Sequence, residues 1–317
     1  MHADINMSGR LPHIGLLRFT GPDAIGFLQG QVSNDTRRLS AGSPVLAAYS
    51  TPQGRVAALF HLLPHSSGII ALLPREIVLP SLERLRKFVL RAKVQIEDVS
   101  EQFWVVGQHG TEALVSSGLA VPDSAGGFAE WSGIGISRVG PRSSRYWVVG
   151  TAADLATRRS ADRPEQAQRV EHDWRLADIR DGLPQVYAAT REMFVAQMLN
   201  LDLIDGISFT KGCFTGQEII ARTQHLGRIK RRLFRLRLPM GTWTIGHAVH
   251  LADGRSGRLT EVARTGDGFE ALAVLNVAAA DIPHSVVADS ADAGAPDSAA
   301  IPAMELPLPY SLTQSTQ

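Results

Sequence analysis

The sequence predicts an α+β protein with more than one domain, and three observations support that prediction. With 317 residues, of which 44% are hydrophobic and 20% charged, the chain is long enough for two or three hydrophobic cores. Apolar segments of strand length alternate with amphipathic helical segments in the first half of the chain. From residue 241 to 277, short strands are separated only by glycine-rich turns, which is typical of a small antiparallel barrel.

The N-terminal part predicts several strands and two helices. Strand-like apolar segments lie at 11–19, 45–50, 56–63, 68–73 and 93–96. The sequence Thr51-Pro52-Gln53-Gly54 has proline second and glycine fourth, so it predicts the turn of a hairpin. One helix is expected after Thr20, which can cap it, and another at 80–90, where the charged side chains gather on a solvated face.

Two similar strand-then-helix units follow between residues 101 and 163. Trp104 to Gly107 precedes a helical segment at 111–117, and Trp147 to Gly150 precedes another at 152–159. Because a glycine-rich loop separates the units, they indicate a split βαβ layout of the ferredoxin type. This part contains no cluster of titratable residues, so we expect a structural role for it.

The only cysteine of the chain, Cys213, lies beside a predicted helix start. Thr215 and Glu218 have the spacing of a capping box, which predicts a helix beginning near residue 216. Cys213 would then sit just outside the N-terminus of that helix, with the positive charges of Lys211 and Arg222 nearby. These conditions lower the pKa of a thiol and make it a nucleophile, metal ligand or redox group. The alternative is a buried, inert cysteine that acts as a small hydrophobe.

A basic strand is predicted directly after this helix, at 228–238. Apolar residues alternate with arginines toward its end, and six of its eleven residues are basic. Such a run is usually a solvated face, but clustered cations can also hold phosphate groups of RNA or of a ligand. The candidate phosphate contacts are Arg228, Lys230, Arg231 and Arg232.

Composition excludes several classes of protein. The net charge of +1 predicts no general attraction to nucleic acid. A single cysteine excludes a Cys-x-x-Cys zinc site and a four-cysteine iron–sulfur site within one copy, so no stable metal site is expected beyond a transient role of Cys213. No apolar segment has the length of a signal peptide or a membrane span, which predicts a cytoplasmic protein, and we expect a monomer.

The motif around Cys213 resembles the signature of the YgfZ-type folate-binding proteins, which are relatives of the glycine-cleavage T-protein, an aminomethyltransferase. The matching run is Lys211, Gly212, Cys213, Phe214, Thr215, Gly216, Gln217 and Glu218. The family usually has tyrosine in place of Phe214. Two further segments are similar to the family, one ending in Ser33-Asn34-Asp35 and one running from Phe194 to Asp202.

The resemblance implies a T-protein-like ring of domains around a central opening where folate binds. Its expected parts are a folate-binding domain formed by residues 1–95 and 170–227, a ferredoxin-like domain at 96–169, and a barrel at 228–317 with a flexible segment at 278–300. The implied function is to assemble or maintain iron–sulfur clusters of client enzymes, including enzymes that modify tRNA. Tetrahydrofolate is the implied ligand, and Cys213 the implied thiolate ligand or redox group, kept ionised by Lys211 and Arg222.

The resemblance also gives candidate folate contacts, each with a structural alternative. Trp174 is a candidate for stacking on the pterin ring, although an aromatic residue beside a helix is more often core packing. The polar candidates are Asn34, Asp35, Gln197 and Asn200, all of which could instead hold turns together.

Departures from the family argue against aminomethyl transfer. Alanines at 57 and 58 stand where the T-protein has an acidic pair, and Arg180 replaces its folate-facing glutamate. Alanine can neither exchange a proton nor stabilise an iminium ion, so a classical aminomethyltransferase is not expected. A folate-dependent one-carbon transferase and a tRNA-binding module that uses residues 228–237 stay open as alternatives.

Overall fold

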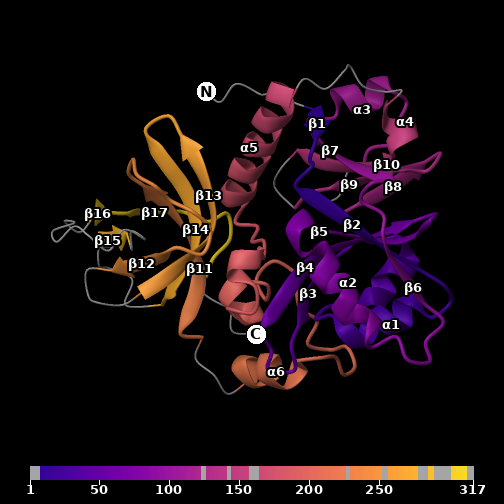
Figure 1. Cartoon of the computed structure of the whole chain (residues 1–317), viewed down its shortest axis with the longest axis horizontal. Helices are drawn as coiled ribbons and strands as arrows, with labels where there is room; N and C mark the ends of the chain where they lie inside the picture. Colours follow the sequence, from indigo (N-terminus) through magenta and orange to yellow (C-terminus); the bar gives the residue numbers. More distant parts are fainter. Residues whose placement is uncertain are drawn as a thin grey trace.

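The computed structural model contains three antiparallel sheets connected by short helices (Figure 1). It describes residues 8–122, 126–140, 144–156, 164–225, 229–251, 256–277, 285–288 and 301–312. No helix in these ranges is both long and apolar enough to cross a membrane.

The N-terminal sheet has the strand order β3-β4-β5-β2-β6. Its strands are β2 (Ile14–Thr20), β3 (Val45–Ser50), β4 (Val56–His65), β5 (Gly68–Pro74) and β6 (Gln95–Asp98). The helices α1 (Ala24–Gln31) and α2 (Val78–Arg86) and the 3-10 helices η1 (Thr36–Ala41) and η2 (Arg75–Ile77) accompany it. The predicted strands, hairpin and two helices are therefore confirmed, with shifted ends. Thr20 does not cap α1, because Asp23 is the residue at that position.

The middle sheet has the order β1-β7-β10-β9-β8. Its strands are β1 (Ser8–Arg10), β7 (Phe103–His109), β8 (Phe128–Trp131), β9 (Ile134–Arg138) and β10 (Arg145–Thr151), with the short helices α3 (Glu112–Ser116) and α4 (Ala152–Ala156). Strand β10 pairs antiparallel with both β7 and β9, so it separates the strands on either side of α3. Strand β1 comes from the N-terminal end of the chain, in the range predicted for the first domain.

Helix α5 (Pro164–Asp181) stands between the middle and C-terminal sheets (Figure 1). It packs on β13 and β14 on one side and on β1 on the other. Glycines allow the close approach to the middle sheet: a Cβ atom on Gly107 would lie 2.5 Å from the Trp174 ring, and one on Gly9 would lie 2.6 Å from Val170. The domain boundary predicted between residues 169 and 170 falls inside this helix, which joins two sheets.

The C-terminal sheet has the order β16-β15-β12-β13-β14-β11-β17. Its strands are β11 (Arg231–Leu238), β12 (Ala248–Leu251), β13 (Ser256–Thr265), β14 (Gly268–Asn276), β15 (Ser285–Ala288), β16 (Ile301–Pro302) and β17 (Met304–Leu306). The two edge strands β16 and β17 are separated in sequence only by Ala303, so the sheet must curl until its edges approach. The predicted barrel is therefore a curled half-barrel. The segment predicted as flexible, 278–300, contains β15, and its other residues lie outside the described ranges.

Three short helices complete the chain between α5 and β11. They are η3 (Ala188–Thr190), η4 (Ala196–Leu199) and α6 (Gln217–His225). One hydrophobic core is formed jointly by this region, strands β3 and β4, and strands β11, β13 and β14. The segment that carries Cys213 is therefore packed between the N-terminal and C-terminal sheets.

Candidate functional site

The cysteine motif is fitted tightly to the hairpin turn between β3 and β4. Gly216 has a φ of +82°, and a Cβ atom there would lie 2.6 Å from the carbonyl oxygen of Thr51. Gly54 in the turn has a φ of +71°, and its Cβ atom would lie 2.8 Å from the Cβ of Ile219. Only glycine combines this backbone conformation with so close an approach, so both glycines are needed for the motif to sit on the turn.

Lys211 anchors the motif to the end of α1. Its ammonium donates to the carbonyl oxygens of Gln29 and Val32, both at 2.7 Å, and of Asn34 at 2.9 Å. An ammonium has three protons, so these three bonds use all of them. Burial lowers the pKa of Lys211 to about 8. All three hydrogen bonds of Lys211 go to backbone carbonyls and none goes to Cys213. The role of Lys211 in holding the Cys213 thiolate therefore stays a prediction.

Cys213 itself is exposed to solvent. The predicted helix start near residue 216 is confirmed, because α6 begins at Gln217. The predicted capping box is wrong, because Gly216 and not Thr215 directly precedes the helix. The Thr215 amide instead donates to the carbonyl of Gly30 at 3.2 Å. Contacts with α1 and with the hairpin turn therefore override the local capping signal. Arg222 is exposed on α6.

Asn34 and Asp35 are held in structural hydrogen bonds. The Asn34 side-chain amide, 2% exposed, donates to the carbonyls of Leu46 (2.9 Å) and Asp205 (2.6 Å), and its oxygen accepts from the Asp35 amide. Asp35 caps η1 and pairs with Arg37 at 2.6 Å, an interaction that holds the pKa of the Asp35 carboxyl well below its usual range. The alternative given above, that Asn34 and Asp35 hold a turn together, therefore explains the contacts of both side chains.

Gln197 and Asn200 likewise hold backbone segments together. The Gln197 amide donates to the carbonyl of Ile220 at 2.7 Å, which joins η4 to α6. Asn200 donates to the carbonyl of Leu233 at 2.9 Å and accepts from its amide at 3.3 Å, which joins the same region to β11. Neither side chain has any exposed surface.

Trp174 is core, so its expected place in a ligand pocket is corrected. It is 1% exposed, because Gly107 lies against its ring and the Arg145 guanidinium stacks over it, 4.7 Å from the ring centroid. The small cavity that it borders has a volume of about 20 Å³, which cannot hold a pterin.

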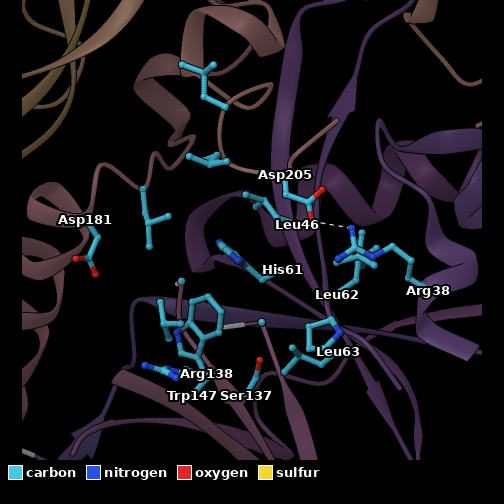
Figure 2. A pocket seen from close by; sticks show the side chains of 18 of the residues that line it. Arg38, Leu46, His61, Leu62, Leu63, Ser137, Arg138, Trp147, Asp181 and Asp205 are labelled. Carbon is cyan, nitrogen blue, oxygen red and sulfur yellow. Dashed lines mark hydrogen bonds and ion pairs between the residues drawn. The ribbon is translucent and has the colours of Figure 1, made fainter. Parts of the chain in front are cut away.

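A larger cavity of about 420 Å³ lies between the N-terminal sheet, the middle sheet, the end of α5 and the C-terminal tail (Figure 2). Much of its wall is apolar, formed by Val45, Leu46, Leu62, Leu63, Val139, Leu183, Leu203 and Ile204. A cavity of this size with apolar walls and a few polar groups is typical of a small-molecule site. Pro309 and Tyr310 of the tail complete the wall, and the Tyr310 hydroxyl donates to the carbonyl of Gly182 at 2.8 Å.

Two rings meet edge to face in the wall of this cavity. Figure 2 shows His61 of β4 and Trp147 of β10, whose ring centroids lie 4.5 Å apart at an interplanar angle of 62°. Burial lowers the pKa of His61 to about 4, so the imidazole is neutral at physiological pH. The Trp147 indole N–H is buried without an acceptor among the described residues.

Charged residues lie at both sides of the cavity. Arg38 and Asp205 form an ion pair of 2.7 Å on one side, and Asp181 lies on the other, where it pairs with Arg145 (Figure 2). Arg138 of β9 adds a further guanidinium to the lining. A planar heterocycle with an anionic tail would find both an apolar aromatic wall and cationic groups here.

The basic strand offers fewer free cations than its sequence suggested. Arg232 is 4% exposed and is held by Asp202 at 2.5 and 2.8 Å, so it is not available to a phosphate. Arg235 pairs with Glu270 at 2.7 Å. Lys230 and Arg231 are exposed, and Arg228 lies outside the described residues.

The cavity residues were not found by sequence reasoning. His61, Trp147, Arg138 and Asp181 come from four separate elements, and none belongs to a local motif. Only Trp147 had been noticed, as part of a repeated strand pattern. Among the described residues, no group of three His, Cys, Asp or Glu side chains is arranged to hold a metal ion.

The arrangement of the three sheets is similar to the fold of an aminomethyltransferase T protein. A crystal structure of glycine cleavage system aminomethyltransferase T from Bartonella henselae matches 90% of this chain and 82% of that one, with a TM-score of 0.65 and 14% identity. At this identity the likeness concerns the fold alone. No protein-family model matches the chain.

Sequence relatives identify the family. The "tRNA-modifying protein YgfZ" of Colwellia psychrerythraea is 33% identical over 227 residues, which cover 71% of this chain and 69% of the relative. The protein of the same name from Serratia proteamaculans is 30% identical over 307 residues, covering 94% and 91%. The chain belongs to the YgfZ family.

Proposed function

We propose that this protein is a folate-binding accessory protein for the assembly or maintenance of iron–sulfur clusters, with client enzymes that modify tRNA. Tetrahydrofolate or a related folate would bind in the central cavity, and Cys213 would act as a transient thiolate ligand or redox group toward a cluster. The observation that carries the proposal is the 420 Å³ cavity lined by Trp147, His61 and two arginines. The names of the relatives, which call them tRNA-modifying, support the choice of clients.

The chemistry of the cavity suits a folate. Trp147 lines the cavity and has an indole N–H without an acceptor among the described residues, and the neutral His61 adds no charge beside an uncharged pterin. The guanidinium groups of Arg38, which also pairs with Asp205, and of Arg138 line the cavity, so the carboxylates of a glutamyl tail would meet positive charge there. Folate when bound would supply one-carbon or reducing chemistry, while the residues named here bind and orient it.

Aminomethyl transfer is less well supported. Ala57 and Ala58 have no exposed surface and belong to the core of the N-terminal sheet, so no carboxylate lies at those positions. Arg180, which replaces the family's glutamate, pairs with Glu270 at 2.9 Å on the C-terminal sheet. The basic strand gives little support to a tRNA-binding module, because Arg232 and Arg235 already have carboxylate partners.

The geometry around Cys213 suits a thiol that meets another macromolecule. Lys211, Gly216 and the hairpin turn fix the backbone on either side of it, while the cysteine remains exposed. A thiol held rigidly at the surface can reach a cluster on a client protein, and a reducing cytoplasm would keep it free.

Complementation tests this function. Wild type, Cys213→Ala and, as a matched control, Ser208→Ala would be placed in a cell without its own copy, and an iron–sulfur-dependent methylthiolated tRNA nucleoside would be quantified. At equal soluble expression, wild type and the serine variant should restore the product and the cysteine variant should not. Equal restoration by all three would contradict the role of Cys213.

A further inference from the structure

The segment 87–93 follows α2, which lies on the side of the molecule away from the C-terminal sheet (Figure 1). In the segment 86–93, six of the eight residues are exposed, and only Val89 and Ala92 are partly buried. Val89 and Ala92 pack against the core of the N-terminal sheet. The outward residues are Lys87, Phe88, Leu90, Arg91 and Lys93, which we call the 87–93 surface.

The cations of this surface have their charge available. Within the described ranges, Lys87, Arg91 and Lys93 form no ion pair, in contrast to Arg232, Arg235 and Arg237 of β11, which pair with Asp202, Glu270 and Asp267. Their side chains are exposed. A phosphate backbone would therefore meet three unneutralised cations here.

Apolar side chains stand among these cations. Phe88 is 41% exposed and Leu90 is 88% exposed, and Leu90 has a φ of +36°. A leucine in the left-handed region is unfavourable, so tertiary contacts must hold this backbone in place. An exposed aromatic ring among cations is the combination with which proteins hold unpaired bases of RNA.

The backbone of the segment is fixed by its neighbours. The amide of Lys93 donates to the Asp23 carboxylate at 2.7 Å, and the Arg86 guanidinium donates to the carbonyl of Ile96 at 3.0 Å. A Cβ atom on Gly21 would lie 2.2 Å from the carbonyl oxygen of Lys93, so a close backbone contact clamps the end of the segment. A surface fixed in this way loses little conformational entropy when it binds.

We propose that the 87–93 surface binds tRNA directly, with Lys87, Arg91 and Lys93 on phosphates and Phe88 stacked on an unpaired base. The inference rests on the proposed function, which places tRNA-modifying enzymes among the clients. Lysine is depleted in protein–protein interfaces, so a surface with two exposed lysines favours nucleic acid over a protein partner.

The salt dependence of binding gives the expected magnitude. Each phosphate contact adds about 0.7 to 0.9 to the slope of log affinity against log salt. Three contacts add roughly 2.1 to 2.7, so between 50 and 200 mM salt the wild type should lose about 20- to 40-fold more affinity than a variant without them. Replacing Phe88 by alanine should weaken binding by at least about fivefold, the effect of one lost base stack.

The experiment is an anisotropy titration of an unmodified tRNA transcript with wild type and two triple variants. The test variant carries Lys87→Ala, Arg91→Ala and Lys93→Ala. The control carries Lys230→Ala, Arg231→Ala and Arg237→Ala. It removes the same number of positive charges as the test variant, from the distant strand β11 and the residue before it. The proposal expects the slope to fall in the test variant and to stay at the wild-type value in the control.

Several results would overturn the proposal: no binding of tRNA by wild type, equal slopes in the two triple variants, or binding of anionic lipid vesicles in preference to tRNA. A tetrahydrofolate titration of the same variants separates the two proposals. Folate binding should be unchanged in the test variant. If wild type bound tRNA through this surface but did not bind folate, the proposed function would fail while this inference stood.

Discussion

Replacing Gly216 by alanine should destabilise the cysteine motif strongly, and the structure gives the size of the effect. The φ of +82° costs an alanine about 1 kcal/mol relative to glycine. The new Cβ atom would also lie 2.6 Å from the Thr51 carbonyl oxygen and 3.1 Å from the Gly54 Cα, and both are backbone atoms that cannot rotate away. Relief of such an overlap costs about 1 to 3 kcal/mol, so we expect a total loss of roughly 3 kcal/mol.

Gly212→Ala is the matched control, because it lies in the same motif with no atom within 4 Å of the added Cβ and no left-handed φ. Thermal unfolding by calorimetry would compare the two variants with wild type. For a chain of this size, about 3 kcal/mol corresponds to a fall in Tm of roughly 5 to 10 °C, whereas the control should shift by less than about 2 °C. Equal shifts in the two variants would refute the close packing of Gly216 on the hairpin turn.

Three further predictions concern buried ionisable side chains. Arg232→Met removes the guanidinium that pairs with the buried Asp202 carboxylate, so urea unfolding should show a loss of about 3 to 5 kcal/mol, and a loss below about 1 kcal/mol would contradict the buried pair. Burial lowers the pKa of Lys211 to about 8, so between about pH 8 and 10.5 the unfolded chain binds more protons than the folded one. The free energy of unfolding of wild type, relative to Lys211→Met, should therefore rise with pH in this range. A difference between the two proteins that does not change with pH would contradict the lowered pKa. Burial also lowers the pKa of His61 to about 4, so protonation favours the unfolded chain. Stability relative to His61→Asn should therefore fall as the pH decreases from about 6.5 to 4, and parallel curves would be inconsistent with a neutral buried imidazole.

Local patterns predicted much of the fold. The hairpin around Thr51 to Gly54 and the strands before and after it follow from turn chemistry and apolar runs, both of which act over a few residues. The partner of Arg232 was less predictable, because Leu233 and Leu236 of β11 have opposite parity and are both buried, so alternation alone does not identify an inner face. A buried arginine needs a carboxylate partner, and Asp202, which supplies it, lies 30 residues earlier in the chain.

The candidate site was less predictable, for a physical reason. His61 and Trp147 meet only because two different sheets face each other across the cavity, and no spacing within either strand encodes that meeting. Trp174, by contrast, lies four residues after Val170 on one helix face, and both side chains are buried. That helical spacing is typical of core packing, which is the role the structure gives it.

Folate binding by the cavity is the central claim, and a calorimetric titration with tetrahydrofolate tests it most directly. The proteins would be wild type, Trp147→Leu and, as a control, Trp131→Leu on β8, where the tryptophan is 57% exposed and does not line the cavity. With Tm values confirming that all three are folded, we predict wild-type affinity for the control and at least about tenfold weaker binding for Trp147→Leu, since loss of one stacking face has an effect of that order. Equal affinities for the two variants, or no binding by wild type, would contradict the account.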